Sequence, residues 1–132
     1  MRGDRGLFEQ TVEFQFDAAH SLRGYEGKCA RLHGHTYRVQ VALEGRELDP
    51  IGMLLDFRRV KDACRGIIEG LDHTCVNEVP PFDRLNPTCE NLAWHLYERF
   101  SEALADERVS VRHVTVWETP TSAVTYRPEA SA

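Results

Sequence analysis

Hydrophobic and polar residues alternate along two segments in the N-terminal part of the chain, residues 11–20 and 35–44. Alternate side chains of an extended strand point to opposite faces of a sheet, so this pattern predicts two strands that are each buried on one face. The parity that we expect to be buried holds Val12, Phe14, Phe16, Ala18 and His20 in the first strand, and His35, Tyr37, Val39, Val41 and Leu43 in the second. Both strands therefore direct histidines to the side of their apolar residues.

Two later segments have apolar residues at the spacing of an α-helix that is buried along one side. Asp56 is a candidate N-cap for the first helix, which we expect to end near Leu71. Its apolar positions are Val60, Cys64, Ile67, Ile68 and Leu71. The second helix follows Pro87-Thr88, and its apolar side holds Leu92, Leu96, Phe100 and Leu104.

The remaining segments complete the pattern of an α+β domain. Residues 74–85 are polar and contain Pro80-Pro81, which predicts a loop. Residues 109–117 and 123–126 predict two more strands, joined by a turn at 119–122. The order of strand, strand, helix, helix, strand, strand predicts an antiparallel sheet with the helices packed on one face. The length of 132 residues fits a single domain over residues 1–132.

Composition narrows the functional classes. The net charge of −5 argues against a nucleic-acid-binding surface. The chain has no run of about 18 apolar residues, so we expect no membrane span. The first ten residues contain no apolar segment typical of a secretion signal, and we expect a cytoplasmic protein. Its four cysteines should then be reduced, since thiols stay reduced in that compartment; they are Cys29, Cys64, Cys75 and Cys89.

Three histidines are expected to meet where the first two strands lie side by side. His20 and His35 are on the buried parities, and His33 points the same way as His35 if the second strand begins at His33. Three imidazoles confined together repel one another when protonated, and a divalent cation removes this conflict. Three nitrogen ligands with one open position are typical of catalytic zinc. The alternative is that each is an ordinary core or edge histidine, because His-x-His spacing alone is a weak signal.

Cys29 lies four residues before His33, in the loop between the two strands, and Lys28 and Arg31 flank it. Nearby positive charge and a metal ion both favour the thiolate, which is the reactive form of cysteine. Two other interpretations stay open. Cys29 is then either a fourth zinc ligand, which would make the site structural, or an inert loop thiol.

Two further positions carry candidate chemistry. Asp72 and His73 follow the first helix, and an aspartate beside a histidine can set its tautomer or stabilise its charged form. The alternative is a polar helix exit. Glu118 directly follows the predicted strand at residues 109–117. It is either a solvent-exposed carboxylate or an acceptor for two N–H groups of a guanidine-like ligand edge.

These residues belong to a series of motifs that resembles the 6-pyruvoyl-tetrahydropterin synthase family, most closely its 6-carboxy-tetrahydropterin synthase branch. The motifs are FDAAH at residues 16–20, CARLHGH at 29–35, LLDF at 54–57, LDH at 71–73, PTCENLA at 87–93 and WET at 117–119. They occur in the family's order over nearly the whole chain. The spacing of three residues between Cys29 and the His-Gly-His motif resembles the carboxy branch.

The resemblance implies a T-fold, which is a four-stranded antiparallel sheet with two helices on one face, and a homohexamer built from two trimers. It implies Zn²⁺ bound by His20, His33 and His35. It also implies Cys29 as the proton acceptor, His73 with Asp72 as the second acid/base, and Glu118 as the anchor of the pterin ring.

The activity implied is that of a zinc-dependent lyase acting on 7,8-dihydroneopterin triphosphate. Its products are 6-carboxy-5,6,7,8-tetrahydropterin, acetaldehyde and triphosphate, in 7-deazaguanine and queuosine biosynthesis. The alternatives within the family are a 6-pyruvoyl-forming or a folate-linked lyase, and Glu26 keeps the folate-linked activity open. An alternative of another class is a non-catalytic, zinc-stabilised binding module. We expect a small pterin triphosphate as partner, with no nucleic acid and no membrane.

Overall fold

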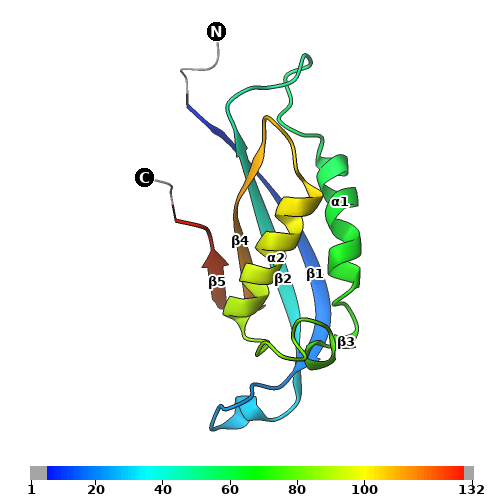
Figure 1. Ribbon diagram of the computed structural model, residues 1–132, viewed down its shortest axis with the longest axis vertical. Helices are drawn as coiled ribbons and strands as arrows, with labels where there is room; N and C mark the ends of the chain where they lie inside the picture. The colour runs from blue at the N-terminus through cyan, green and yellow to red at the C-terminus, as the bar shows by residue number, and fades with distance from the viewer. Residues whose placement is uncertain (1–5, 130–132) are drawn as a thin grey trace.

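A computed structural model describes residues 6–129, and this part of the chain contains five strands and two α-helices. In chain order the elements are β1 (Phe8–His20), the 3-10 turn η1 (Lys28–Ala30), β2 (His33–Gly45), α1 (Phe57–Glu69), β3 (Thr74–Cys75), the 3-10 turn η2 (Val76–Glu78), α2 (Cys89–Ala103), β4 (Ser110–Thr119) and β5 (Ser122–Tyr126). Figure 1 shows β1, β2 and β4 as long strands with both helices beside them.

The strands form one sheet in the order β3-β1-β2-β4-β5. β1, β2, β4 and β5 pair antiparallel, which confirms the predicted arrangement of four antiparallel strands. The predicted loop over residues 74–85 is different at its start, where Thr74 and Cys75 form a short strand parallel to β1. The turn after α1 brings the chain to this edge, because the His73 N–H donates a hydrogen bond to the Asp17 carbonyl at 2.6 Å.

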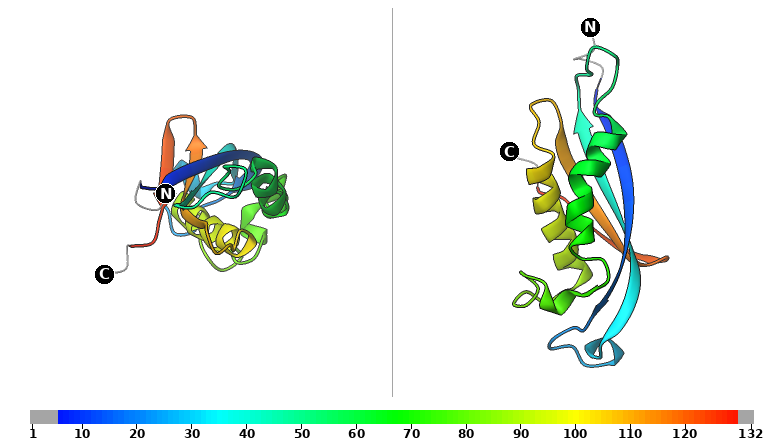
Figure 2. Two further views of the ribbon diagram at one scale, coloured as in Figure 1. Left: turned by 90° about the horizontal axis from the view of Figure 1, so that it is seen from above. Right: turned by 90° about the vertical axis from the view of Figure 1, so that its right-hand side faces the viewer.

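Both helices cover the same face of the sheet, as predicted, and the core lies between these two layers (Figure 2). The strand parity read from the sequence is confirmed, because the side chains that point toward the helices are the buried ones. The largest fully buried side chains include Phe16, Tyr37, Phe82, Leu92, Leu96 and Phe100. The apolar core therefore determines which strand face also carries the histidines.

Side-chain caps define where each helix starts. The Asp56 carboxylate accepts a hydrogen bond from the Arg58 N–H at 2.8 Å, which confirms Asp56 as the N-cap of α1. The Thr88 hydroxyl accepts a hydrogen bond from the Asn91 N–H at 3.1 Å and caps α2. α1 ends at Glu69, slightly earlier than expected, and the Leu71 side chain beyond it is still buried.

The four cysteines are free thiols, and two of them belong to the core. Cys64 in α1 and Cys89 in α2 are buried, and burial is the main cause that raises the pKa of each thiol to about 12. They are therefore protonated packing residues. None of the helices within residues 6–129 has the length and apolar character needed to cross a bilayer.

The face of the sheet opposite the helices is polar, with Arg38 at its centre. The Arg38 guanidinium lies 3.7 Å from the ring centroid of Trp117 and 3.2 Å from a carboxylate oxygen of Glu13. The sheet also has open edges in the described part of the chain, since β3 covers β1 only at Ala18 and Ala19, and β5 pairs with β4 alone. Such edges offer unpaired N–H and C=O groups to another strand.

The close packing at the end of β2 can be tested at Gly45. A Cβ atom there would lie 2.5 Å from the Arg108 carbonyl oxygen and 2.8 Å from a Leu54 methyl carbon, whereas a Cβ atom at Gly66 in α1 would meet nothing within 4 Å. We predict that Gly45→Ala lowers the free energy of unfolding by about 1–3 kcal/mol, as overpacking usually does. The matched variant Gly66→Ala should raise it by about 0.5–1 kcal/mol, because alanine is the better helix former. Urea denaturation measures both, and effects of the same sign would contradict this account.

Candidate metal centre and the surrounding site

Three histidines meet at the lower end of the sheet in Figure 1, where β1 ends and β2 begins. His20 pairs directly with His33 across the two strands, and His35 is opposite Ala18. The Nε2 atoms of His20 and His33 are 3.0 Å apart, and one nitrogen from each of the three rings lies within 4.8 Å of the others. The structure therefore brings together the three residues that strand parity selected.

Backbone carbonyls orient two of the three rings. Nδ1 of the buried His20 lies 2.8 Å from the Pro87 carbonyl oxygen, and Nδ1 of His33 lies 2.6 Å from that of Arg31. A carbonyl can only accept, so each Nδ1 carries the proton and donates it, which leaves the Nε2 lone pair directed into the cluster. His35 Nε2 is also buried and has no hydrogen-bond partner in residues 6–129. Two unprotonated nitrogens beside the unpartnered Nε2 of His35 fit a divalent metal ion.

Burial keeps these rings in the form that binds metals. Loss of solvent lowers the pKa of His20 and of His35, and the neighbouring histidines lower it further. The Pro87 carbonyl opposes this shift at His20, and the Glu118 carboxylate opposes it at His35. The net lowering means that both imidazoles are neutral near pH 7, which is the state that a metal ligand requires.

Glu118 reaches the cluster from β4. One carboxylate oxygen lies 3.3 Å from Nε2 of His20 and 3.6 Å from Nε2 of His35. The carboxylate does not belong to the group of donor atoms that lie within 4.8 Å of one another, so it lies beside the candidate metal site. Glu118 also lines a recess of about 540 Å³, together with Gln15, Gly34, His35, Thr36, Arg38, Trp117, Thr119 and Pro120. Glu118 therefore borders both the histidine cluster and this recess.

Asp72 and His73 form a second, exposed part of the site in the turn between α1 and β3. Nδ1 of His73 lies 3.0 Å from one carboxylate oxygen of Asp72, and the other oxygen accepts the Asp17 N–H at 2.9 Å. The Asp17 N–H and then the His73 ring lower the pKa of the Asp72 carboxyl, which favours its charged form. The backbone of His73 is in the left-handed region, with a φ of 58°. Non-glycine residues in this region cluster at functional sites.

His35 lies between the two parts. A second recess of about 440 Å³ is lined by Asp17, Ala18, Ala19, Gly34, His35, Thr36, His73 and Thr74. It shares Gly34, His35 and Thr36 with the recess at Glu118. A ligand that filled both recesses would extend from Glu118, past the histidine cluster, to His73.

Cys29 lies in η1, on the loop that joins β1 to β2, and its side chain is exposed. The Cys29 carbonyl accepts a hydrogen bond from the Leu22 N–H at 3.0 Å. Among the described residues, the possible metal ligands that lie within 4.8 Å of one another at this place are the three histidines, and Cys29 is not one of them. The alternative in which Cys29 is a fourth ligand therefore has no support in this geometry.

Sequence analysis did not single out Asp17, which contacts both Asp72 and His73. Its backbone N–H and C=O bind Asp72 and His73, and its side chain accepts a hydrogen bond from the Thr36 hydroxyl at 2.5 Å. The only local signal was its place in the FDAAH motif. Contacts that a residue makes through its backbone cannot be predicted from its side chain.

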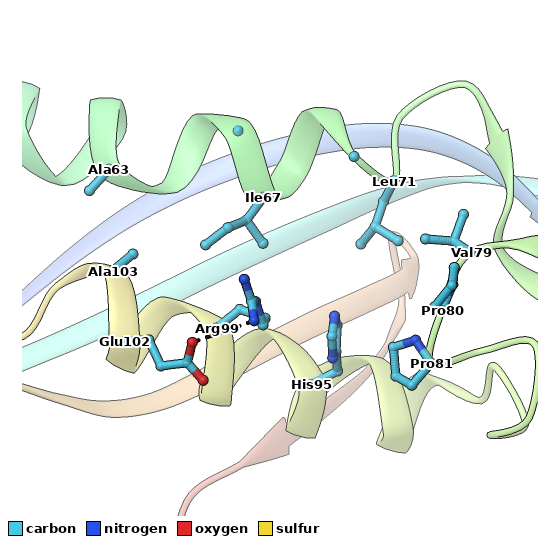
Figure 3. Close-up of a pocket in the computed structure, with 12 residues that line it drawn as sticks. Ala63, Ile67, Leu71, Val79, Pro80, Pro81, His95, Arg99, Glu102 and Ala103 are labelled. Carbon is cyan, nitrogen blue, oxygen red and sulfur yellow. Dashed lines mark ion pairs between the residues drawn. The ribbon is translucent and has the colours of Figure 1, made fainter.

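Another recess, of about 820 Å³, lies elsewhere in the structure (Figure 3). It lies between α1 and α2, with Ile67 on one wall and His95 on the other, and an Arg99–Glu102 ion pair of 3.4 Å lies at its side. None of the predicted site residues lines it. The candidate chemistry is concentrated at the end of the sheet.

Comparison with known proteins gives a consistent result. The model of the 6-pyruvoyl tetrahydropterin synthase family matches residues 9–129. A Bacillus subtilis protein named 6-carboxy-5,6,7,8-tetrahydropterin synthase is 36% identical over 129 residues, which cover 92% of this chain and 86% of that protein. A Haemophilus influenzae protein of the same name is 33% identical over 144 residues, covering 92% and 99%.

A solved structure agrees with these sequence relatives. The 6-pyruvoyl tetrahydropterin synthase of Caenorhabditis elegans matches the fold with a TM-score of 0.86 at 26% identity, over 98% of this chain and 99% of that one. The T-fold implied by the sequence motifs is thus confirmed, with the short β3 as an addition to its four main strands. Since the family match extends over almost the whole described chain, the protein belongs to the 6-pyruvoyl tetrahydropterin synthase family.

Proposed function

We propose that this protein is a zinc-dependent lyase that converts 7,8-dihydroneopterin triphosphate into 6-carboxy-5,6,7,8-tetrahydropterin, acetaldehyde and triphosphate. The names of the relatives from Bacillus subtilis and Haemophilus influenzae support the carboxy branch. The observation that carries the proposal is the histidine cluster, with three inward nitrogens beside the Glu118 carboxylate. In this reading the protein supplies 7-deazaguanine and queuosine biosynthesis, and its cytoplasmic location stays a prediction.

Zinc is the ion that we propose for His20, His33 and His35, because neutral imidazoles are among its preferred ligands. Bound there, zinc would act as a Lewis acid toward the hydroxyl groups of the substrate side chain. The chain itself supplies the ligand orientation. The carbonyls of Pro87 and Arg31 hold two rings in place, and they do not titrate, so this orientation persists over a wide range of pH.

Glu118 is proposed to anchor the pterin ring. Its carboxylate borders both the histidine cluster and the recess at Trp117, and 30% of the side chain is exposed to solvent. A carboxylate can accept two hydrogen bonds from a ring N–H and the neighbouring amino group of a pterin. Held in this way, the substrate side chain would extend toward His35 and the second recess.

Cys29 and the Asp72–His73 pair are proposed to move protons. Cys29 as thiolate would accept a proton from a carbon of the substrate side chain, and His73 would give or take protons elsewhere on the same molecule. The contact of 3.0 Å between His73 and Asp72 supports this role, because a carboxylate on Nδ1 fixes the tautomer and stabilises the charged ring. The recess that His73 shares with His35 gives both residues access to one ligand.

A 6-pyruvoyl-forming activity is the second candidate, supported by the match to the Caenorhabditis elegans enzyme over nearly the entire length of both chains. Incubation with 7,8-dihydroneopterin triphosphate, followed by mass spectrometry, tests both. We expect 6-carboxy-tetrahydropterin and acetaldehyde. A 6-pyruvoyl product would favour the second candidate, and unchanged substrate would contradict both.

We also propose a homo-oligomer, a hexamer of two trimers, as the sequence resemblance implies. The open edges of β1 and β5 support self-association, because strands of neighbouring copies can pair there. Sedimentation equilibrium would test this assembly.

The metal assignment predicts the behaviour of ligand variants. We expect His33→Ala and His35→Ala together to remove bound zinc, since two of its three ligands are lost. Zinc content after dialysis, measured by atomic absorption, checks this. The control is His113→Ala, in a histidine outside the cluster, which should retain zinc. Full zinc occupancy in the double variant would show that the metal binds elsewhere.

The proposed role of His73 and Asp72 in proton transfer can be tested by substitution. His73→Ala should lower kcat by about 100-fold or more, because loss of a general acid/base commonly has this effect. Asp72→Asn should also lower kcat, since the amide no longer stabilises the charged imidazole. Steady-state kinetics and metal analysis check both, and zinc content should not change. Wild-type kcat in His73→Ala would return this pair to the role of a polar helix exit.

A further inference from the structure

The segment of residues 76–87 binds the chain directly after the metal ligand His20. The Asn77 side chain accepts the Ser21 N–H and donates to the Ser21 carbonyl, both at 2.9 Å. The Asn86 side chain accepts the Arg23 N–H at 2.9 Å and donates to the Arg23 carbonyl at 3.1 Å. Two asparagines thus pair with the backbone of residues 21–23 as a neighbouring strand would.

The Arg23 side chain also binds the segment of residues 76–87. Its guanidinium donates to the carbonyl oxygens of Phe82 at 2.6 Å, Leu85 at 3.3 Å and Asn77 at 3.4 Å. No carboxylate within residues 6–129 forms an ion pair with it. A planar guanidinium with donors directed at three carbonyls crosslinks two segments, and both of its terminal nitrogens are engaged.

This clamp extends to Cys29. Leu22 lies between the two clamped residues, and its N–H donates to the Cys29 carbonyl at 3.0 Å. The turn that carries Cys29 also leads to the metal ligands, because the Arg31 carbonyl binds Nδ1 of His33. The position of the Cys29 backbone therefore depends on residues 21–23, which in turn depend on Arg23 and the two asparagines.

The opposite end of the same segment holds a metal ligand. The Pro87 carbonyl accepts the hydrogen bond from Nδ1 of the buried His20 at 2.8 Å. One stretch of backbone thus orients a ring of the histidine cluster and fastens the loop of the proposed proton acceptor. This link fixes the loop relative to the metal position.

We propose that Arg23, together with Asn77 and Asn86, is a positioning residue that holds Cys29 in register with the histidine cluster. The inference rests on the proposed function, in which Cys29 takes a proton from the substrate. Arg23 itself touches no reacting atom. A displacement of about 1 Å at a reacting group can cost about 100-fold in rate, so release of this clamp should act on the chemical step.

The test compares Arg23→Ala with Arg84→Ala, both as the full zinc-loaded protein. Arg84 is a matched control, because it is exposed, lies in the same 76–87 segment and has no side-chain hydrogen bond or ion pair among the described contacts. Arg23→Ala should lower kcat by about 10- to 100-fold with KM changed less than about threefold. Zinc content should stay equal, because the three ligands lie on β1 and β2. Arg84→Ala should match the wild type in all three.

Hydrogen exchange measures the clamp without activity. In Arg23→Ala the amides of residues 21–32 should exchange at least about tenfold faster. Loss of the guanidinium leaves residues 21–23 held by fewer hydrogen bonds to the 76–87 segment, so the backbone N–H bonds of this loop open more often. Arg23→Lys serves as the second variant if Arg23→Ala does not fold. It keeps the charge but loses the planar fork, and its kcat should lie between those of wild type and Arg23→Ala.

The outcomes separate the two hypotheses. A raised KM with unchanged kcat would make Arg23 a contact for the substrate's phosphates and overturn the positioning role. Unchanged hydrogen exchange would overturn the clamp itself. A wild-type protein that does not convert 7,8-dihydroneopterin triphosphate would refute the proposed function, and exchange in residues 21–32 would then still decide whether Arg23 holds the loop.

Discussion

The antiparallel register of β1 and β2 is the constraint on which the site depends. It places His20 opposite His33 and Ala18 opposite His35, so that three rings meet at one end of the sheet. Successive side chains alternate between faces, and a slip of one residue in one strand would turn its histidines to the other side. The core holds the register, since Phe16 stacks on Tyr37 with ring centroids 4.7 Å apart. The same strand register therefore determines both the packing of the core and the meeting of the three histidines.

The buried His20 and the partly buried His33 and His35 lie close to the Glu118 carboxylate, an arrangement that a bound cation would stabilise. Desolvation lowers the pKa of His20 and His35, so these rings carry no charge near pH 7 to oppose Glu118. A carboxylate beside neutral rings gains a full counter-charge only when a cation binds among them. The same carboxylate remains partly exposed and lines the recess, where the proposed pterin would offer it two N–H donors.

Local sequence patterns predicted much of this arrangement, and what they missed has a common physical cause. Alternation over residues 11–20 and 35–44 identified the face that carries His20 and His35, and the N-cap at Asp56 was equally readable. The pairing of β3 and the contacts of Asp17 with Asp72 and His73 use backbone N–H and C=O groups of β3 and Asp17. Nearly every residue carries these groups, so the residue types do not predict such contacts. Arg23 binds carbonyls 54 to 62 positions away in the chain, and local sequence patterns do not predict contacts over such a separation.

The proposed metal ligands and proton-transfer groups are held by different kinds of interaction. The histidines lie on paired strands, whose ladders of hydrogen bonds open only with the core. Cys29 and His73 lie on a loop and a turn that a few polar contacts fasten, which are the segments of a domain that adjust most readily. Because the second recess is lined by both His35 and the turn residue His73, a ligand there can shift His73 without moving the histidine cluster. Differences in activity within one family are then expected in the loop and the turn, while the paired strands keep the histidine cluster, since activity resides in side chains placed on a shared fold.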